Sequence, residues 1–446
     1  MKTSILAASI ALALLPAVSS ATPTPPATAD ELAAIRAQIQ ALQADYEQRI
    51  RTLEARLTQA EAEAHTAKQD AAAAQVAASA PVVAAPPAAS ANAFNPAVSA
   101  ILTGTYGQFS RDPADYAIPG FALGDETGLG ERGFSLGESE LDISANVDDL
   151  FYGNLTAALA PEGGVDVEEA YVQTTALPQG FTLKAGRFFS GIGYLNEQHA
   201  HVWDFVDTSL AYRALLGNQY GDDGVQLRWL APTDVFVEFG AEWLRGEAFP
   251  AGGAANDGRG TATAFVHVGG DVGDSHSWRF GLSQLRAQAA GRETGAAPDS
   301  FDGDSHVNIA DFVWKWAPHG NTKITNFKLQ TEYLQRSEDG LFNGLDYNAD
   351  QDGWYAQTIY QFMPRWRVGL RYDRLHADGP GAAFAGTVLD TLGHTPRRNS
   401  LMLDYSNSEF SRLRLQYNRD DAQLASDDQW FLQYITSVGA HGAHAY

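Results

Sequence analysis

The chain has 446 residues and no cysteine, and its 30 Lys and Arg stand against 54 Asp and Glu, which gives a formal net charge of −24. This acidic balance argues against nucleic-acid binding, which normally uses a basic face, so no nucleic-acid partner is expected. The missing cysteine excludes a disulfide scaffold, a thiol enzyme and any cysteine-ligated metal site.

Residues 1–21 have the pattern of an export signal. Lys2 gives a positive start, an apolar stretch rich in Ala and Leu runs from residue 5 to residue 18, and small residues close the segment. The alternative is a membrane anchor, but the apolar run is shorter than the ~18 residues that a spanning helix needs. We therefore expect the mature chain to begin near Thr22 and to act beyond the inner membrane.

A periplasmic segment, residues 22–66, is expected to contain a coiled coil from residue 30 onward. Its apolar residues alternate in spacings of three and four, and one extra spacing of four locally unwinds a supercoil. They are Leu32, Ile35, Ile39, Leu42, Tyr46, Ile50, Leu53 and Leu57. The stripe predicts self-association, and the alternative is an amphipathic helix lying on the rest of the same chain. Residues 67–93 are rich in Ala and Pro and are expected to form a linker.

From residue 94 to residue 446 the sequence alternates with period 2 and lacks helical periodicity. In residues 412–418, for example, Arg, Gln and Asn alternate with Leu and Tyr. A soluble sandwich would bury the apolar face, whereas an outer-membrane barrel turns it to lipid and lines a wet lumen with the polar face. Charged inward faces and Trp residues near strand ends favour the barrel. The predicted fold is an all-β transmembrane antiparallel β-barrel of about sixteen strands, with an N-terminal α-helical coiled coil.

The predicted strands and connectors have a regular layout. The strands are expected at 97–109, 134–147, 150–160, 165–176, 181–189, 222–230, 234–246, 261–271, 276–287, 306–316, 322–336, 351–362, 365–376, 398–406, 410–419 and 428–446. Long connectors are expected at 110–133, 190–221, 247–260, 288–305, 337–350, 377–397 and 420–427, with tight turns between most of them. An even strand count puts both ends of the barrel on the short-turn, periplasmic side.

Three stretches, residues 134–141, 185–201 and 217–227, carry a resemblance to known proteins. The overall layout resembles the trimeric outer-membrane porins, especially phosphate-selective and carbohydrate porins with a periplasmic coiled-coil extension. The three stretches look closer to short proteobacterial outer-membrane proteins labelled zinc-regulated or TonB-dependent receptors. The receptor label fits poorly, because such a receptor needs a plug domain and a barrel of about 22 strands. The resemblance implies a homotrimer embedded in outer-membrane lipid.

The longest connector, residues 190–221, is the candidate pore constriction, since the resemblance to general porins implies that it folds into the lumen. Acidic residues of this connector and inward arginines of later strands make up the candidate constriction. They are Glu197, Asp204, Asp207, Arg365, Arg367, Arg371, Arg412 and Arg414. Acid opposite an arginine wall creates a transverse field that sorts solutes by charge. The alternative is that the arginines pair with lumen acids and only hold the barrel. The acids considered are Glu238, Glu242, Asp311 and Asp404.

The same connector offers a candidate metal site at His199, His201 and Asp204, because imidazole and carboxylate groups suit zinc. Two histidines two positions apart point to opposite sides of a strand, so polar packing of the loop is the alternative. His441 and His444 form a further thin cluster. Apart from weakly bound zinc, no cofactor is expected.

These features predict a porin through which small hydrophilic solutes diffuse passively, with a cation preference that follows from the acidic balance. A phosphate-selective ladder is disfavoured, since Lys184, Lys315, Lys323 and Lys328 are the lysines found from residue 94 onward. Two alternatives are a zinc-linked uptake channel and a structural tether that reaches the cell wall through the coiled coil. No enzyme is expected, although a His and Asp group of the kind that barrel enzymes use surrounds His376 and His394.

Overall fold

A computed structural model describes residues 96–439 except 125–126, 160–163, 254–255, 257, 259 and 296–298. The chain divides into two units, Met1–Ala89 and Ser90–Tyr446. The predicted export signal, coiled coil and linker lie outside the described residues, as do His441 and His444. Within the described part, the helices are all too short to cross a membrane.

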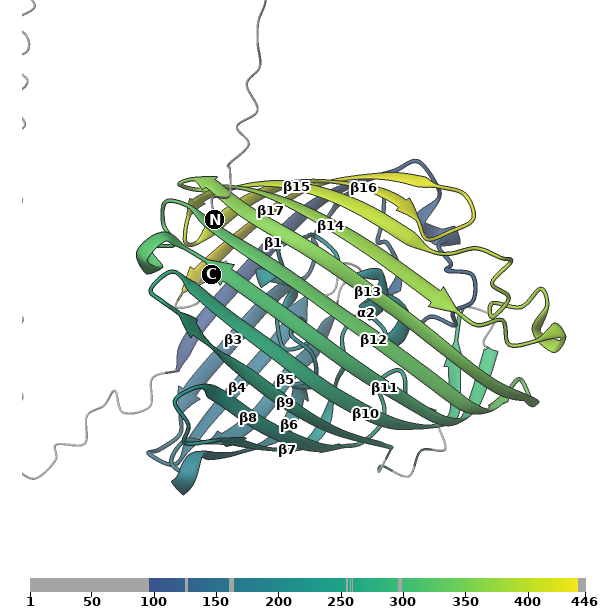
Figure 1. Ribbon diagram of the computed structural model, residues 1–446, viewed down its shortest axis with the longest axis horizontal. Helices are drawn as coiled ribbons and strands as arrows, with labels where there is room; N and C mark the ends of the chain where they lie inside the picture. Colours follow the sequence, from purple (N-terminus) through teal and green to yellow (C-terminus); the bar gives the residue numbers. More distant parts are fainter. Residues whose placement is uncertain are drawn as a thin grey trace, which may run out of the picture. The chain divides into compact units, whose positions relative to one another are not determined.

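The second unit is a closed antiparallel barrel (Figure 1). Its strands are β1 (Ala97–Phe109), β2 (Gly133–Ser135), β3 (Ser139–Asn146), β4 (Phe151–Leu159), β5 (Val165–Thr174), β6 (Phe181–Phe189), β7 (Gly221–Leu230), β8 (Phe236–Leu244), β9 (Thr261–Val272), β10 (His276–Thr294), β11 (Asp299–Trp316), β12 (Asn326–Phe342), β13 (Leu345–Met363), β14 (Trp366–Ala377), β15 (Arg397–Ser408), β16 (Ser411–Asp421) and β17 (Asp427–Gly439). From β3 onward each strand pairs with the next along the chain, and β1 closes the wall by pairing with β17. Both β2 and β3 pair with β1, so they are two pieces of one strand that residues 136–138 interrupt. The wall therefore has sixteen strands, which confirms the predicted fold class.

The helical turns are short and lie in the connectors. They are η1 (Pro113–Asp115), η3 (Pro178–Gly180), η4 (Ala200–Val202), α2 (Leu210–Leu216), η5 (Pro318–Gly320) and η6 (Ala382–Phe384). Two of them, η4 and α2, belong to the connector between β6 and β7, which is the one that the sequence singles out.

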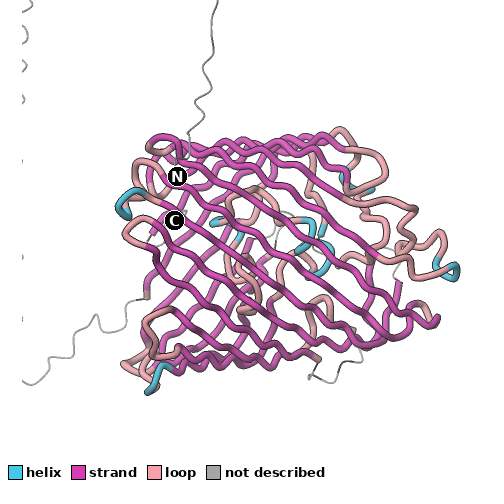
Figure 2. The backbone as a smooth tube through the Cα atoms, viewed as in Figure 1, coloured by secondary structure: helices cyan, strands magenta, loops and turns pink. Residues whose placement is uncertain are grey.

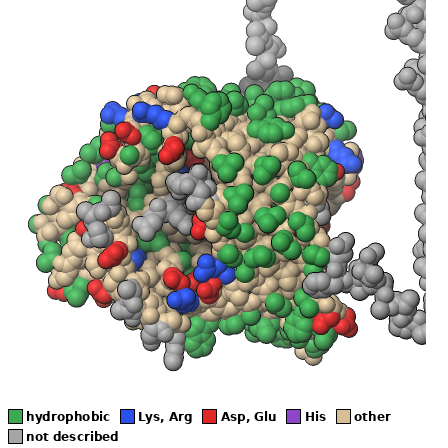
Figure 3. Space-filling model, turned by 180° about the vertical axis from the view of Figure 1, so that it is seen from behind, with side chains coloured by type: hydrophobic (Ala, Val, Ile, Leu, Met, Phe, Trp, Pro, Cys, Tyr) green, Lys and Arg blue, Asp and Glu red, His purple; other side chains and the backbone are tan. Residues whose placement is uncertain are grey.

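The period-2 pattern sorts side chains between the two faces of the wall. On β16, Arg412 and Arg414 are each 1% exposed, whereas Leu413 and Leu415 are 42% and 43% exposed. The leucines thus point away from the barrel and the arginines point into it, the reverse of a soluble core. Figure 3 shows hydrophobic side chains spread over the outside of the wall, with acidic and basic groups gathered toward its ends.

The two ends of the barrel differ in their connectors. One end, which we call the loop end, carries residues 110–132, 190–220, 245–260 and 378–396. The other, which we call the turn end, carries tight turns such as residues 364–365 and 409–410. Because β1 and β17 are antiparallel neighbours, the first described strand starts and the last one ends at the turn end.

Two connectors that were predicted to be long are tight, so the expectation for 288–305 and 337–350 was wrong. The strands β10 to β13 are 17 to 19 residues long and run through most of both ranges. Asn343 and Gly344 alone join β12 to β13, and their φ values of 52° and 77° are the positive values that a tight hairpin turn needs. Polar residues such as Gln288 replace apolar ones on the outward face here, which hides the strand pattern in the sequence.

Candidate functional site

Residues 190–220, which join β6 to β7, lie inside the barrel (Figure 2). We call this segment the inward loop. Its helix α2 packs against β12, β13 and β14, and all seven of its residues are buried. Ser209 caps the start of α2 by accepting a hydrogen bond from the Tyr212 backbone, and Gly217 ends it with a φ of 65°. The inward loop therefore has a fixed internal structure.

A buried glutamate of the wall, Glu332 on β12, holds the first turn of the inward loop. Its carboxylate accepts hydrogen bonds from the backbone N–H groups of Tyr194 at 2.9 Å and Leu195 at 3.1 Å. The Tyr212 hydroxyl from α2 donates to the same carboxylate at 2.8 Å, and the Tyr355 hydroxyl of β13 does so at 2.5 Å. One side chain thus fixes two separate parts of the loop to the wall.

Close backbone approach explains the glycines in this turn. Gly193 has a φ of 69°, and a Cβ built on it would lie 2.6 Å from a Glu332 oxygen. The Gly191 backbone N–H donates to Glu242 of β8 at 2.9 Å, so a second wall glutamate faces the same turn. Any larger residue at position 193 would push the turn away from the wall.

Asp204 binds cationic side chains of the wall. It forms an ion pair with Lys328 of β12 and another with Arg367 of β14, the latter at 3.2 Å. Arg367 also binds Asp404 of β15 at 2.5 Å. Burial raises the pKa of the Asp204 carboxyl, but the charges of Lys328 and Arg367 outweigh burial and hold that pKa well below its ordinary value.

Asp207 anchors the next part of the inward loop to β14, β15 and β16. Its carboxylate binds Arg371 at 2.7 Å and Arg398 at 2.6 Å, and it accepts hydrogen bonds from Gln416 at 2.8 Å and Asn418 at 3.1 Å. Burial raises the pKa of this carboxyl too, yet the neighbouring guanidinium groups of Arg398 and Arg371 bring it well below its ordinary value. The group is therefore charged at neutral pH.

The other predicted arginines play different parts. Arg412 donates to the backbone carbonyl of His201, and Arg414 donates to that of Trp203, each at 2.5 Å. Arg365 lies in the exposed turn between β13 and β14 with a φ of 74°, so its placement on the inward face was wrong. The period-2 alternation of the strands does not hold in this turn, because β14 begins only at Trp366.

We expected the acids of the loop to face the arginine wall across an open pore. Asp204 and Asp207 instead form ion pairs directly with side chains of the wall. Glu197 pairs with Arg228 of β7, which is not among the predicted arginines. The alternative of these arginines pairing with lumen acids holds for Asp404, which binds Arg367, whereas Glu238 pairs at 3.7 Å with Arg228, which is not one of the predicted arginines. Among the described residues, neither Glu242 nor Asp311 forms such an ion pair.

The two histidines of the inward loop lie in a separate acidic group, which we call the acid corner. It consists of Glu140 of β3, Glu168 and Glu169 of β5, and His199 and His201. His199 Nδ1 lies 3.2 Å from Glu168 and 3.4 Å from Glu140, and its Nε2 lies 2.9 Å from Glu169. Burial lowers the pKa of His199, but hydrogen bonds to Glu168 and Glu169 outweigh burial and raise it well above its ordinary value.

The predicted metal trio of His199, His201 and Asp204 is not brought together as one site. Asp204 lies with Lys328 and Arg367, which occupy its carboxylate. The carboxylates that approach the histidines come instead from the barrel wall, far away in sequence.

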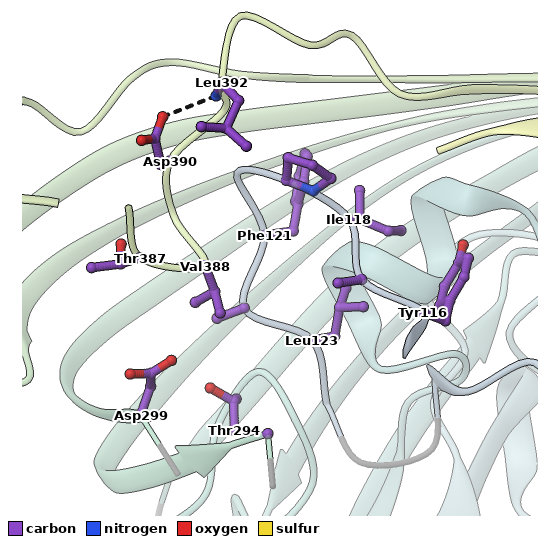
Figure 4. Close-up of a pocket in the computed structure, with 14 residues that line it drawn as sticks. Tyr116, Ile118, Phe121, Leu123, Thr294, Asp299, Thr387, Val388, Asp390 and Leu392 are labelled. Carbon is purple, nitrogen blue, oxygen red and sulfur yellow. Dashed lines mark hydrogen bonds between the residues drawn. The ribbon is translucent and has the colours of Figure 1, made fainter. Parts of the chain in front are cut away.

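A separate apolar pocket of about 290 Å³ lies at the loop end, between residues 116–123 and residues 387–392 (Figure 4). Side chains of both loops face one another there, while Asp390 turns aside to accept a hydrogen bond from the Leu392 backbone at 2.9 Å. The Gly120 N–H donates to the Val388 carbonyl at 3.0 Å and joins the two loops. The pocket is thus a packing feature of loops that cover part of the loop end.

Comparison with known proteins gives one relative by sequence and many by fold. No family model matches the chain. A protein of Aquifex aeolicus, described only as uncharacterized, is 31% identical over 394 residues, which cover 80% of this chain and 81% of the relative. The chain belongs to the family of this protein. The zinc-regulated label that the sequence resemblance suggests stays a prediction.

Solved structures with a similar fold include a porin and an outer-membrane protein. An anion-selective porin from Comamonas acidovorans has a TM-score of 0.51 at 11% identity and covers 77% of this chain and 99% of its own. OmpT of Vibrio cholerae, in a trimer form, has a TM-score of 0.50 at 12% identity over 77% and 99%. OprB of Pseudomonas putida has a TM-score of 0.50 at 11% identity over 77% and 94%. The sixteen-strand barrel is therefore a porin fold.

Proposed function

We propose that the protein is an outer-membrane channel through which small hydrophilic solutes diffuse, with the inward loop as its constriction. The observation that carries this proposal is a closed wall with an apolar outside and a charged inside, crossed by a loop that ion pairs hold in place. An apolar outer surface needs lipid around it, and a polar lumen suits water and small polar solutes. The fold shared with the anion-selective porin of Comamonas acidovorans supports the same function.

In this proposal Asp204 and Asp207 do not sort solutes by their own charge. Their ion pairs with Arg367, Arg371 and neighbouring cations neutralise them and set the position of the loop. Arg412 and Arg414 act with them, since they bind the loop through its backbone carbonyls. The ion pairs hold the loop in one position, and this position sets the width of the channel at its constriction.

A cation preference follows from the acid corner. Glu140, Glu168 and Glu169 have imidazoles as their ion-pair partners, and across the described residues none of the three pairs with Lys or Arg. Three carboxylates against two imidazoles leave negative charge on this side of the lumen, and fixed charge concentrates counter-ions. The net charge of −24 acts in the same direction.

We further propose a homotrimer whose turn end faces the periplasm, which would place the predicted coiled coil there. The trimer form of the similar Vibrio cholerae OmpT supports the assembly. No catalytic role is proposed. A tether to the cell wall is the alternative for the coiled coil, and deleting residues 22–93 separates the two: a channel keeps its conductance, whereas a tether loses its role.

Current through a planar lipid bilayer under a salt gradient tests the function. We expect current steps that arrive in threes, with a reversal potential of the sign that cation selectivity requires. Changing Glu168→Gln together with Glu169→Gln reduces that selectivity, while the control Glu247→Gln, in an exposed connector, leaves it unchanged. Folded protein that passes no current overturns the channel, and an anion-selective reversal potential overturns the cation preference.

A further inference from the structure

We propose that the acid corner is a binding site for one divalent first-row transition-metal ion such as Zn²⁺. The ligands are Nδ1 of His199, Oε2 of Glu140 and Oε2 of Glu168. This proposal gives a physical basis to the zinc-linked alternative for the channel, so it extends the proposed function. The site can be tested by binding alone, without any current.

The spacing of the three ligand atoms fits a single ion. One ligand atom from each of the three residues lies within 4.8 Å of the other two, and Nδ1 is 3.2 Å from the Glu168 oxygen and 3.4 Å from the Glu140 oxygen. In a tetrahedral zinc site, bonds of about 2.0–2.1 Å place neighbouring ligand atoms about 3.3 Å apart. One proton on Nδ1 cannot be donated well to both carboxylates at once, whereas one cation can be bound by all three groups.

Two further contacts orient the ligands as they would be in a metal site. The other ring nitrogen of His199, Nε2, lies 2.9 Å from Glu169, and the other oxygen of Glu140 lies 2.8 Å from His201 Nδ1. A ligating histidine commonly donates its second N–H to a carboxylate, which fixes the ring and its tautomer, and ligating carboxylates are hydrogen-bonded in turn. Glu169 and His201 are therefore supporting residues in the proposed site.

The burial of the ligands leaves a route for an ion. Glu140 is 1% exposed, while the side chains of His199 and Glu168 are 19% and 14% exposed. The site is thus closed at the wall and open on one side, where an ion and a fourth ligand can enter. Without metal, a proton on His199 serves the same carboxylates, and an incoming ion displaces it.

The ligand types point to a transition metal and away from Ca²⁺ or Mg²⁺. Those ions prefer six or more oxygen ligands, whereas imidazole with two carboxylates is a set that Zn²⁺ commonly uses. A bound ion would link the inward loop to β3 and β5, on the opposite side of the loop from the β12 and β14 contacts of Asp204. It would also reduce the negative charge on which the cation preference rests.

Isothermal titration calorimetry of the purified full-length protein in detergent, with zinc chloride as the probe, tests the site. We expect one Zn²⁺ per chain, binding lost or weakened at least about 100-fold in His199→Ala and Glu168→Gln, and a loss of about 10- to 100-fold in Glu169→Gln. The matched control is His267→Ala, because His267 is an inward-facing imidazole with a single glutamate partner, Glu238. Its zinc binding should equal that of the unaltered protein.

Three results would overturn the site: no zinc binding, zinc binding unchanged in His199→Ala, or Ca²⁺ binding as tight as Zn²⁺ binding. Visible absorption of Co²⁺ added in place of zinc reports four-coordinate geometry and should vanish in the same variants. Heat-modifiable migration on a gel checks the folding of each variant, and Glu168→Gln keeps the test valid if His199→Ala does not fold. A protein that binds zinc but conducts nothing refutes the channel and keeps the site.

Discussion

Replacing Asp207 by alanine tests whether ion pairs hold the inward loop against the wall. The change removes a carboxylate that binds two guanidinium groups at 2.6 and 2.7 Å and leaves both of them buried. Removing one partner of a buried ion pair costs about 3–5 kcal/mol. Arg371 and Arg398 can still share Asp373, at 3.1 and 3.4 Å, so we expect a cost near the lower limit, about 3 kcal/mol.

A cost of this size raises the population of released loop by about 100-fold, since each 1.4 kcal/mol is a factor of ten. We therefore expect Asp207→Ala to conduct more than the unaltered channel and to lose its folded gel mobility at a lower temperature. Asp207→Asn keeps the shape and should show a smaller effect. The control Glu247→Gln removes an exposed pair with Arg245 and should change stability by less than about 1 kcal/mol. Unchanged conductance and melting in Asp207→Ala would refute the reasoning.

Three further predictions concern the same loop. Because the pKa of Asp204 is lowered in the folded protein, its ion pairs stabilise the fold fully at any pH above the unfolded pKa of about 3.9, and this stabilisation is lost as pH falls through the still lower folded pKa. Bilayer conductance should therefore stay constant from about pH 8 to 5 and rise only below about pH 4. A rise in conductance that begins near pH 6 contradicts this. Glu332→Gln should lower the stability of the folded barrel by about 1–3 kcal/mol in thermal melts, because the amide presents donors to groups that are themselves donors. Gly193→Ala should destabilise more than Gly386→Ala, a control with a φ of 77° and open space around it, and equal melting temperatures would count against the close contact with Glu332.

Much of the wall could be predicted because alternation along a strand is a local property. The predicted strand 181–189 matches β6 at both ends, and the inward placement of Arg412 and Arg414 is confirmed by their burial. The strand prediction failed where the alternation of apolar and polar residues no longer marks the two faces of the wall. Arg365 sits in a turn, and beyond the apolar belt the outward face of β10 to β13 carries polar residues such as Gln288 and Asn308.

The partners inside the lumen could not be predicted in the same way. Alternation marks Glu332 and Arg398 as residues of predicted strands, but it does not say which inward residues meet the loop. Asp207 and Asn418 are 211 positions apart, and their contact depends on the path of a loop without periodicity. The sequence likewise offered His199 and His201 as a pair, while their glutamate partners on β3 and β5 come near only because β3 to β6 pair side by side and the loop folds back over them.

The route of the inward loop has a consequence for biogenesis. The loop is translated before β12 to β16, yet its anchors Lys328, Arg371, Arg398 and Asn418 all lie on these later strands. Asp204 and Asp207 therefore meet these partners only when β12 to β16 stand in the wall together with the earlier strands. A barrel that lacks these later strands differs from the finished one by two carboxylates without their ion pairs at its centre, so docking of the loop requires both halves of the wall.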